Sequence, residues 1–85
     1  MSIADELITR GWAQGELRDG EGRVCLMGAV HFAHDRTVEG AYKRAIKALI
    51  EACPAECFVE WRDAPERTFD EVLRVAKIAD EILGA

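Results

Sequence analysis

Two histidines and two cysteines have the types and spacing that a metal ion could use. His31 and His34 stand three positions apart in a segment that we expect to be helical. Cys53 and Cys57 stand four apart across the end of another expected helix. Residues three or four apart share one face of a helix, and zinc in structural sites takes four nitrogen and sulfur ligands. A zinc-stabilised module built on these side chains is therefore one hypothesis.

The surroundings of these residues favour a plainer interpretation. Zinc fingers bring two cysteines together on a tight knuckle, which the stretch 53–57 matches poorly. All three cysteines lie within apolar segments, and their odd number does not suit a disulfide framework. We therefore expect reduced, buried thiols beside two partly exposed histidines, and we predict no metal ion and no cofactor.

Cys25 is the candidate for nucleophilic catalysis, because it lies where we expect the second helix to begin. A catalytic thiol needs a neighbouring base or a helix N-terminus to lower its pKa from about 8.5. The first histidine along that helix, His31, is one to two turns away, which is too far for direct activation. We therefore assign no catalytic residue and expect Cys25 to pack in the core.

Trp12, Trp61 and Asp63 are the candidate binding residues. Trp61 and Asp63 flank a turn that we expect at the surface, where they could form a recognition site. The alternative is structural: Trp61 would cover the core, and Asp63 would accept hydrogen bonds from backbone N–H groups before the last helix. A pocket that includes Trp12 and Trp61, under the glycine-rich loop 15–22, would make the chain a small enzyme, which is a further alternative.

Other common active-site patterns are missing from the sequence. The loop 15–22 holds three glycines and three acids but lacks the glycine and lysine spacing that cradles phosphates, which argues against nucleotide binding. Acidic residues are scattered, and none stands alone in an apolar run, so no carboxylate pair can be assigned to acid–base catalysis. We expect the charged faces to be solvated surface.

The charge balance and the hydropathy pattern argue against two classes of partner. The formal net charge of −5 repels a phosphate backbone, whose binding needs a concentrated stripe of Lys and Arg. The 11 basic residues are mixed among 16 acidic ones, which argues against an acidic face that mimics DNA. No apolar run approaches the roughly 20 residues that span a bilayer, and residues 1–10 carry acids where a secretory signal has bases. We therefore expect a cytoplasmic protein that binds neither nucleic acid nor membrane.

Helices are the elements that must position these residues. With 85 residues, of which 49% are hydrophobic, the chain has room for one core, and we expect a single helical domain over residues 1–85. Aliphatic side chains and alanine supply most of the hydrophobic fraction, and aromatic residues make up 7% of the chain. This balance favours helices over sheets.

Local signals mark the first and the last helix. Ser2 predicts the start of the first helix, Gly11 predicts its end, and Ile3, Leu7 and Ile8 should share its buried face. A capping box of Thr68 and Glu71 opens the last helix, and Gly84 ends it. The buried stripe of this last helix should consist of Phe69, Val72, Leu73, Ala76, Ala79, Ile82 and Leu83.

Two further helices are expected between these. Residues 24–33 are apolar nearly all round and predict a helix at the centre of the core. Thr37 and Glu39 predict the start of an amphipathic helix that Pro54 closes. Residues 57–61 could be a short strand or an extended linker, and residues 62–67 a loop. The stretch 14–23 should be an exposed loop, or a hairpin if 16–18 pairs with 23–25. The fold class is thus mainly α: a compact bundle of about four helices, with a short two-stranded ribbon as an option.

Four short segments carry a resemblance to an uncharacterised protein family. They are WAQG at 12–15, GRVCLMGA at 22–29, WRD at 61–63 and TFDEV at 68–72. Together they resemble a domain of unknown function found in small proteins of actinobacteria and their phages. The resemblance covers nearly the whole chain but implies no activity, cofactor or catalytic residue. The family pattern often has asparagine where this chain has Arg62, so no polar role is carried over to that position.

The function that we expect from these observations is protein–protein interaction. No catalytic constellation emerges from the residues, and small domains often enlarge their core by pairing. We expect a helical interaction module that binds another protein or itself. A homodimer would use the helix over 37–53 or the last helix, and a phage-encoded protein would act on a protein of its host.

Overall fold

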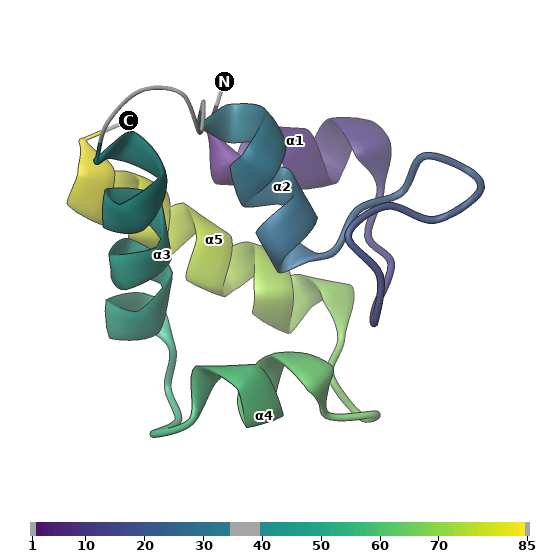
Figure 1. Ribbon diagram of the computed structural model, residues 1–85. Coiled ribbons are helices and arrows are strands. Elements are labelled where there is room, and N and C mark those ends of the chain that lie inside the picture. The colour runs from purple at the N-terminus through teal and green to yellow at the C-terminus, as the bar shows by residue number, and fades with distance from the viewer. Residues whose placement is uncertain (1, 35–39, 85) are drawn as a thin grey trace.

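The structure, a computed structural model, describes residues 2–34 and 40–84. This part of the chain contains five helices. They are α1 (Ile3–Arg10), α2 (Leu26–Ala33), α3 (Ala41–Ala52), α4 (Phe58–Asp63) and α5 (Phe69–Leu83). Figure 1 shows α5 in the middle of the molecule, with α1 and α2 above it and α4 below it. None of these described helices is long and apolar enough to cross a bilayer. The prediction of a mainly α fold is confirmed, with one helix more than expected.

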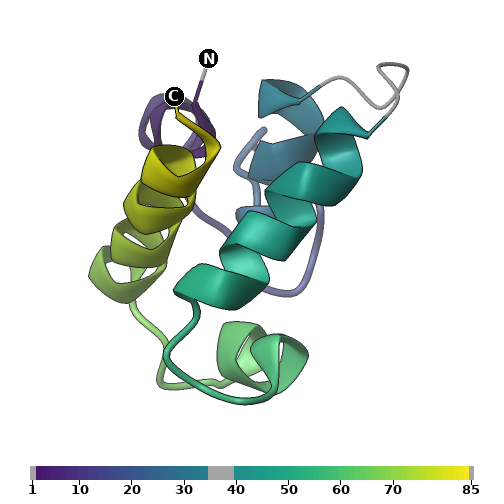
Figure 2. The same cartoon turned by 90° about the vertical axis from the view of Figure 1, so that its left-hand side faces the viewer.

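The core lies between α5 and the helices packed on it. Helices α3 and α5 lie side by side and run in opposite directions (Figure 2), and α1 packs against both α2 and α5. One cluster of buried residues draws on all five helices. Its largest fully buried side chains are Ile3, Leu7, Val24, Leu26, Val30, Leu49 and Val72. The five helices therefore enclose a shared apolar interior.

The helix ends follow the capping chemistry that the sequence predicts. Ser2 Oγ accepts a hydrogen bond from the backbone N–H of Asp5 at 3.0 Å, which satisfies a donor at the start of α1. The capping box of Thr68 and Glu71 is present at the start of α5. Gly84 ends α5 in the left-handed conformation, with φ of 78°. These predictions are confirmed because each depends on contacts within a few residues.

Helix α4 corrects the expectation of a strand or linker over 57–61. Phe58 and Trp61 are three positions apart, and they are only 9% and 7% exposed. A helical turn places such a pair on the same side, whereas a strand would turn them to opposite faces. Burial of both rings therefore favours the helix, which runs to Asp63 and shortens the predicted loop to residues 64–67.

Helices α2 and α3 differ in detail from the predictions. Phe32 at the end of α2 is 43% exposed, so α2 is not buried all round. Its ring lies under the guanidinium of Arg10, whose Cζ is 3.6 Å from the ring centroid. Helix α3 begins after Gly40, which has a φ of 82° and gives no side-chain cap. The predicted start at Thr37 and Glu39 lies outside the described residues.

The segment between α1 and α2 folds back on itself through single bridges. Val24 pairs with Trp12 in a parallel bridge and with Arg18 in an antiparallel one. The carbonyl of Val24 accepts from the N–H of Ala13, and the N–H of Val24 donates to the carbonyl of Gly11, both at 2.9 Å. These isolated bridges replace the optional ribbon within the described residues, although the two arms of the predicted hairpin do approach each other.

Asp19 holds the tip of this segment. Its Oδ1 accepts hydrogen bonds from the backbone N–H groups of Glu21 and Arg23, both at 2.9 Å. Its Oδ2 lies 2.6 Å from Nε of Arg23. Desolvation raises the pKa of Asp19, but the hydrogen bonds from Arg23 and Glu21 outweigh it, and the net pKa lies below the usual value. The turn is thus built around an ionised carboxylate.

Two acidic residues, Glu6 and Asp80, are buried, at 5% and 6% exposure. Glu6 pairs with Arg10 at 2.6 Å. The carboxylate of Asp80 accepts hydrogen bonds from the backbone N–H groups of Ile3 and Ala4, at 2.9 and 3.0 Å. The expectation that charged groups lie only on solvated faces is wrong at these two positions. A buried carboxylate is tolerated because its charge is paired or hydrogen-bonded.

Two isoleucines that were predicted to be buried are exposed. Ile8 is 57% exposed and Ile82 is 49% exposed. The face of α1 that meets α2 and α5 is formed instead by Ile3, Ala4 and Leu7. In the last turns of α5 the buried positions are Ala79 and Asp80, next to α1. Asp80, through its hydrogen bonds to α1, therefore belongs to the face of α5 that turns inward.

Candidate functional site

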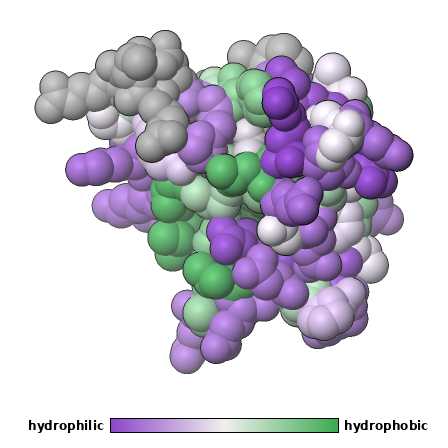
Figure 3. Space-filling view, turned by 45° about the vertical axis from the view of Figure 1, so that its right-hand side comes forward, coloured by the Kyte–Doolittle hydropathy of each residue, from purple (hydrophilic) through white to green (hydrophobic). Residues whose placement is uncertain are grey.

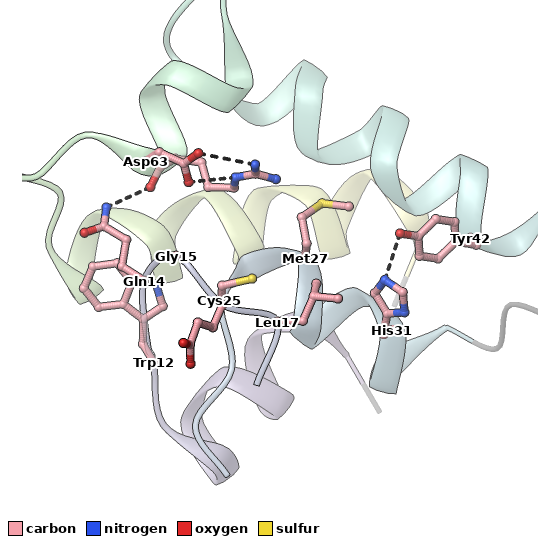
Figure 4. Close-up of a pocket in the computed structure, with 11 residues that line it drawn as sticks. Trp12, Gln14, Gly15, Leu17, Cys25, Met27, His31, Tyr42 and Asp63 are labelled. Carbon is pink, nitrogen blue, oxygen red and sulfur yellow. Dashed lines mark hydrogen bonds and ion pairs between the residues drawn. The ribbon is translucent and has the colours of Figure 1, made fainter. Parts of the chain in front are cut away.

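A pocket of about 350 Å³ lies between the segment 12–17 and helices α2, α3 and α4. One wall of the pocket is formed by Trp12 and by residues 14–17. Cys25 and Met27 line it from the start of α2, and Arg62 and Asp63 line it from α4. Figure 4 shows Trp12 and Gln14 at one end of this pocket, and His31 and Tyr42 at the other. Its volume is in the range of small-ligand sites.

Gln14 fastens the pocket wall to the end of α4. Its side-chain nitrogen donates to the backbone carbonyls of Arg62 at 2.9 Å and Ala64 at 2.7 Å. Both partners are acceptors, so the amide must turn its NH₂ group toward them and its oxygen away. These two bonds join parts of the chain that are 48 and 50 positions apart.

Gly28 lets the same wall cross directly over α2. A Cβ atom at this position would lie 2.0 Å from the backbone oxygen of Leu17 and 3.1 Å from Cβ of Val24. No side chain fits in that space, because real Cβ atoms do not approach a carbonyl oxygen so closely. The glycine in the middle of α2 therefore fixes how close the pocket wall comes to the helix.

His31 and Tyr42 close the far end of the pocket and connect α2 with α3. The Tyr42 hydroxyl lies 3.0 Å from Nε2 of His31. The two rings meet edge to face, with centroids 5.0 Å apart. Depending on the histidine tautomer, either the hydroxyl donates to the ring nitrogen or the ring N–H donates to the hydroxyl oxygen.

The charges of the pocket come from Glu16, Arg62 and Asp63. Nε of Arg62 lies 3.2 Å from Oδ1 of Asp63, and the guanidinium also lies 5.7 Å from the centroid of the Phe58 ring. Asp63 thus pairs with Arg62, in place of the predicted bonds to backbone N–H groups. Glu16 is exposed and takes part in no ion pair within the described residues. The three charges sum to −1.

The structure brings Trp12 and Asp63 to this pocket but places Trp61 elsewhere. Trp12 lines the pocket and stacks on Phe69, with ring centroids 6.3 Å apart. Trp61 is a core residue that borders a separate hollow of about 170 Å³ next to α5. The guanidinium of Arg67 covers its ring at 4.3 Å. The position of Trp61 thus corresponds to the structural alternative, in which its side chain covers the core.

The cysteines have three different environments. Cys25 is buried at the N-terminus of α2, where its Sγ accepts a hydrogen bond from the N–H of Gly28 at 3.4 Å. Cys53 is half-buried, and Cys57 is exposed. The expectation of buried thiols is therefore correct for Cys25 and wrong for Cys57, because α3 ends before the loop that carries it.

The proposed zinc ligands do not come together. Within residues 2–34 and 40–84, no group of three or more His, Cys, Asp or Glu side chains is placed to hold a metal ion. His31 bonds Tyr42, and Nε2 of His34 is buried with no hydrogen-bond partner among the residues that the structure describes. The two histidines are three positions apart in the sequence, but their side chains have different environments in the fold.

Sequence reasoning missed several residues of the pocket. Gln14, Leu17, Met27 and Tyr42 carried no signal of their own, because their places depend on contacts between distant segments. The glycine in an otherwise apolar helix was the one available signal, since such a residue often marks a close approach of another backbone.

Comparison with family models gives a match over most of the chain. Neither the curated proteins nor the solved structures contain a match to this sequence. The model of a family of unknown function, DUF6197, matches residues 2–81. This agrees with the resemblance to an uncharacterised family that the four segments carry. The chain therefore belongs to DUF6197, a family of unknown function.

Proposed function

We propose that this chain is a small interaction module that binds a partner protein at the face containing the pocket. The observation that carries the proposal is the exposed side chain of Leu17, 53% accessible, beside a concave surface of apolar and charged groups. Protein interfaces are typically built from an apolar or aromatic side chain in a pocket with polar groups around it. A phage origin would make a protein of the host the natural partner.

Helix α3, which lines the pocket through Tyr42, carries half-buried and exposed apolar side chains along one ridge. Tyr42 and Ile46 on α3 are partly buried, and Ile50, on the next turn of the same ridge, is 51% exposed. Figure 3 shows hydrophobic side chains in green beside a broad hydrophilic area in purple on one face of the molecule. A contiguous apolar area bordered by polar residues is typical of contact sites.

Contacts within the pocket favour binding over catalysis. The thiol of Cys25 accepts a backbone N–H bond, and the imidazole of His31 bonds Tyr42. A helix N-terminus can activate a thiol without a base, but the Cys25 thiol is buried, and His31 bonds Tyr42 rather than the sulfur. The Arg62–Asp63 pair likewise occupies both groups.

The test is photo-crosslinking from the pocket rim in cells of the natural host. A photoreactive amino acid at position 17 should attach one specific protein, whereas the same group at the exposed Lys77 on α5 should not. Excess unlabelled protein should compete for the attachment, and Leu17→Asp should fail to compete. Val59→Asp is the matched control, because Val59 is also 53% exposed but lies outside the pocket. Equal competition by both variants, or no attachment from position 17, contradicts the proposal.

Self-association is a second candidate, favoured by the exposed isoleucines on α3 and α5. Ile50, Ile78 and Ile82 are 51%, 40% and 49% exposed. Pairing of two copies would cover them and extend the core of a small domain. Light scattering at micromolar concentration should then give about twice the chain mass of 9.4 kDa, and Ile82→Asp should halve it. A particle of 9.4 kDa rules out this candidate.

A small enzyme is the remaining candidate, and the volume of the pocket favours it. About 350 Å³ with charged groups from separate segments suits a metabolite. A thermal-shift screen would identify one that stabilises the protein and that loses its effect in Arg62→Ala. If no compound stabilises the protein, the screen argues against the enzyme and in favour of the partner protein.

A further inference from the structure

We infer that the pocket receives a basic side chain, an arginine or a lysine, of the partner protein. This inference rests on the proposed function and names the chemistry of the contact. Three features carry it: the hydrogen-bond acceptors that the pocket offers, its charge, and its shape.

Gln14 and Glu16 supply hydrogen-bond acceptors to the pocket. Both N–H groups of the Gln14 amide are used by the carbonyls of Arg62 and Ala64, so its oxygen is left to accept. Glu16 adds a carboxylate that no described basic residue pairs with. An ammonium or a guanidinium carries only donors, so it matches this set of acceptors.

The charge of the pocket favours a cation over an anion. Arg62 and Asp63 neutralise each other, with Nε and Oδ1 at 3.2 Å, and Glu16 leaves a net charge of −1. Asp63 already accepts from Nε and Nη2 of Arg62, whose side chain is only 24% exposed, so the guanidinium offers an anion a site that is largely neutralised and covered. The whole chain, at −5, also attracts cations.

The shape suits a long side chain with an apolar stem. Figure 4 shows Cys25, Leu17 and Met27 between the Trp12 end and the His31–Tyr42 end. Apolar side chains along an elongated pocket can cover the methylene groups of lysine or arginine while the charged head remains solvated. The indole of Trp12, which lines the pocket, is the best aromatic partner for a cation.

The experiment is an NMR titration of the ¹⁵N-labelled full chain with capped amino acids. N-acetyl-arginine amide and N-acetyl-lysine amide are the probes, N-acetyl-citrulline amide is the uncharged match for arginine, and N-acetyl-glutamate amide is the anion. Titration to about 10 mM detects binding in the millimolar range. We expect saturable shifts from at least one basic probe at the backbone N–H groups of Gly15, Leu17 and Met27 and at the indole N–H of Trp12. Citrulline should bind about fivefold more weakly or worse, because it lacks the charge.

Two variants assign the effect to the pocket carboxylate. Glu16→Gln should weaken binding of the basic probe about fivefold, since it removes the net charge. Glu21→Gln is the matched control on the same exposed segment, because Glu21 lies outside the pocket, 3.5 Å from Arg23. We expect it to bind as the wild type does.

Three results would overturn the inference. They are the absence of saturable shifts from both basic probes, shifts that map outside the pocket, and equal or tighter binding of citrulline or glutamate. If one of them occurs while the crosslink from position 17 remains specific, the interaction module stands and the basic side chain fails. If the crosslink is absent and the titration shifts are absent too, both the interaction module and the basic side chain are overturned.

Discussion

Asp80 and Ile3 are 77 positions apart, yet Oδ1 of Asp80 lies 2.9 Å from the backbone nitrogen of Ile3. Its other oxygen lies 3.0 Å from the nitrogen of Ala4. The first N–H groups of a helix have no partner within the helix, and a negative charge is favourable at that end. One buried carboxylate on α5 therefore both caps α1 and holds it in place.

Removal of this carboxylate should destabilise the fold. Asp80→Ala leaves two N–H groups of α1 without a partner in the core, and we expect a loss of about 2–4 kcal/mol in the free energy of unfolding. Asp80→Asn keeps one acceptor and should lose less. Urea denaturation measures both. Glu81→Ala, at the exposed neighbouring position, is the control and should change stability by less than about 0.5 kcal/mol. Equal effects of Asp80→Ala and Glu81→Ala would show that the bonds contribute nothing.

Gly28 should tolerate no side chain. Gly28→Ala puts a Cβ atom 2.0 Å from the oxygen of Leu17, so either the pocket wall or α2 must move. We expect a loss of about 1–3 kcal/mol from overpacking, together with shifted NMR signals of residues 12–17. Gly20→Ala has nothing within 4 Å of the added atom and is the matched control. A Gly28→Ala protein as stable as wild type would mean that the wall does not lie against the helix.

Much of the fold could be predicted because its signals are local. The Ser2 cap, the Thr68–Glu71 capping box and the end of α3 before Pro54 depend on residues within one turn. Helix α4 could not be predicted in the same way. Its six residues are too few for a periodic pattern, and its helical form follows from the burial of Phe58 and Trp61 against the core.

The site could be predicted only in part. Trp12 and Asp63 attract notice by residue type, and both line the pocket. The pocket itself arises where Gln14 reaches residues 48 and 50 positions away, and where Leu17 crosses Gly28. No spacing within a single segment encodes such contacts. The same reason explains Asp80, which looks like a surface acid of an amphipathic helix until its partners at the other end of the chain are known.

The three thiols should differ in reactivity according to their exposure. Cys57 is exposed, Cys53 half-buried and Cys25 buried with its sulfur bonded to the N–H of Gly28. An alkylating reagent under native conditions should therefore modify Cys57 first and Cys25 last, since access limits the reaction. Mass spectrometry of the peptides over time measures the order, and unfolding in denaturant, which should make the three rates similar, is the control. Fastest modification of Cys25 would indicate an accessible, activated thiolate in the pocket.

Glu71 should make stability depend on pH in the acidic range. Its pKa lies below the usual 4.5, mainly because of the hydrogen bond from the backbone N–H of Thr68. Desolvation, the second effect, raises the pKa, but the Thr68 hydroxyl and the charge and hydrogen bond of Arg67 lower it further. A pKa that is lower in the folded state means that the ionised form stabilises the fold. This contribution is complete above the unfolded pKa, near 4.5, and is lost as the pH falls through the lower folded value.

Glu71→Gln isolates that contribution, because glutamine can still accept the bond from Thr68 but carries no charge. The wild type should melt at a higher temperature than the variant at pH 7, and the two melting temperatures should converge as the pH falls from 4.5 through the lower folded pKa. Glu66→Gln changes an exposed acid in the preceding loop and should leave the difference between pH 7 and pH 3 as in the wild type. A constant gap between wild type and Glu71→Gln across this range would mean that the carboxylate acts through shape alone, because only an effect of charge disappears on protonation.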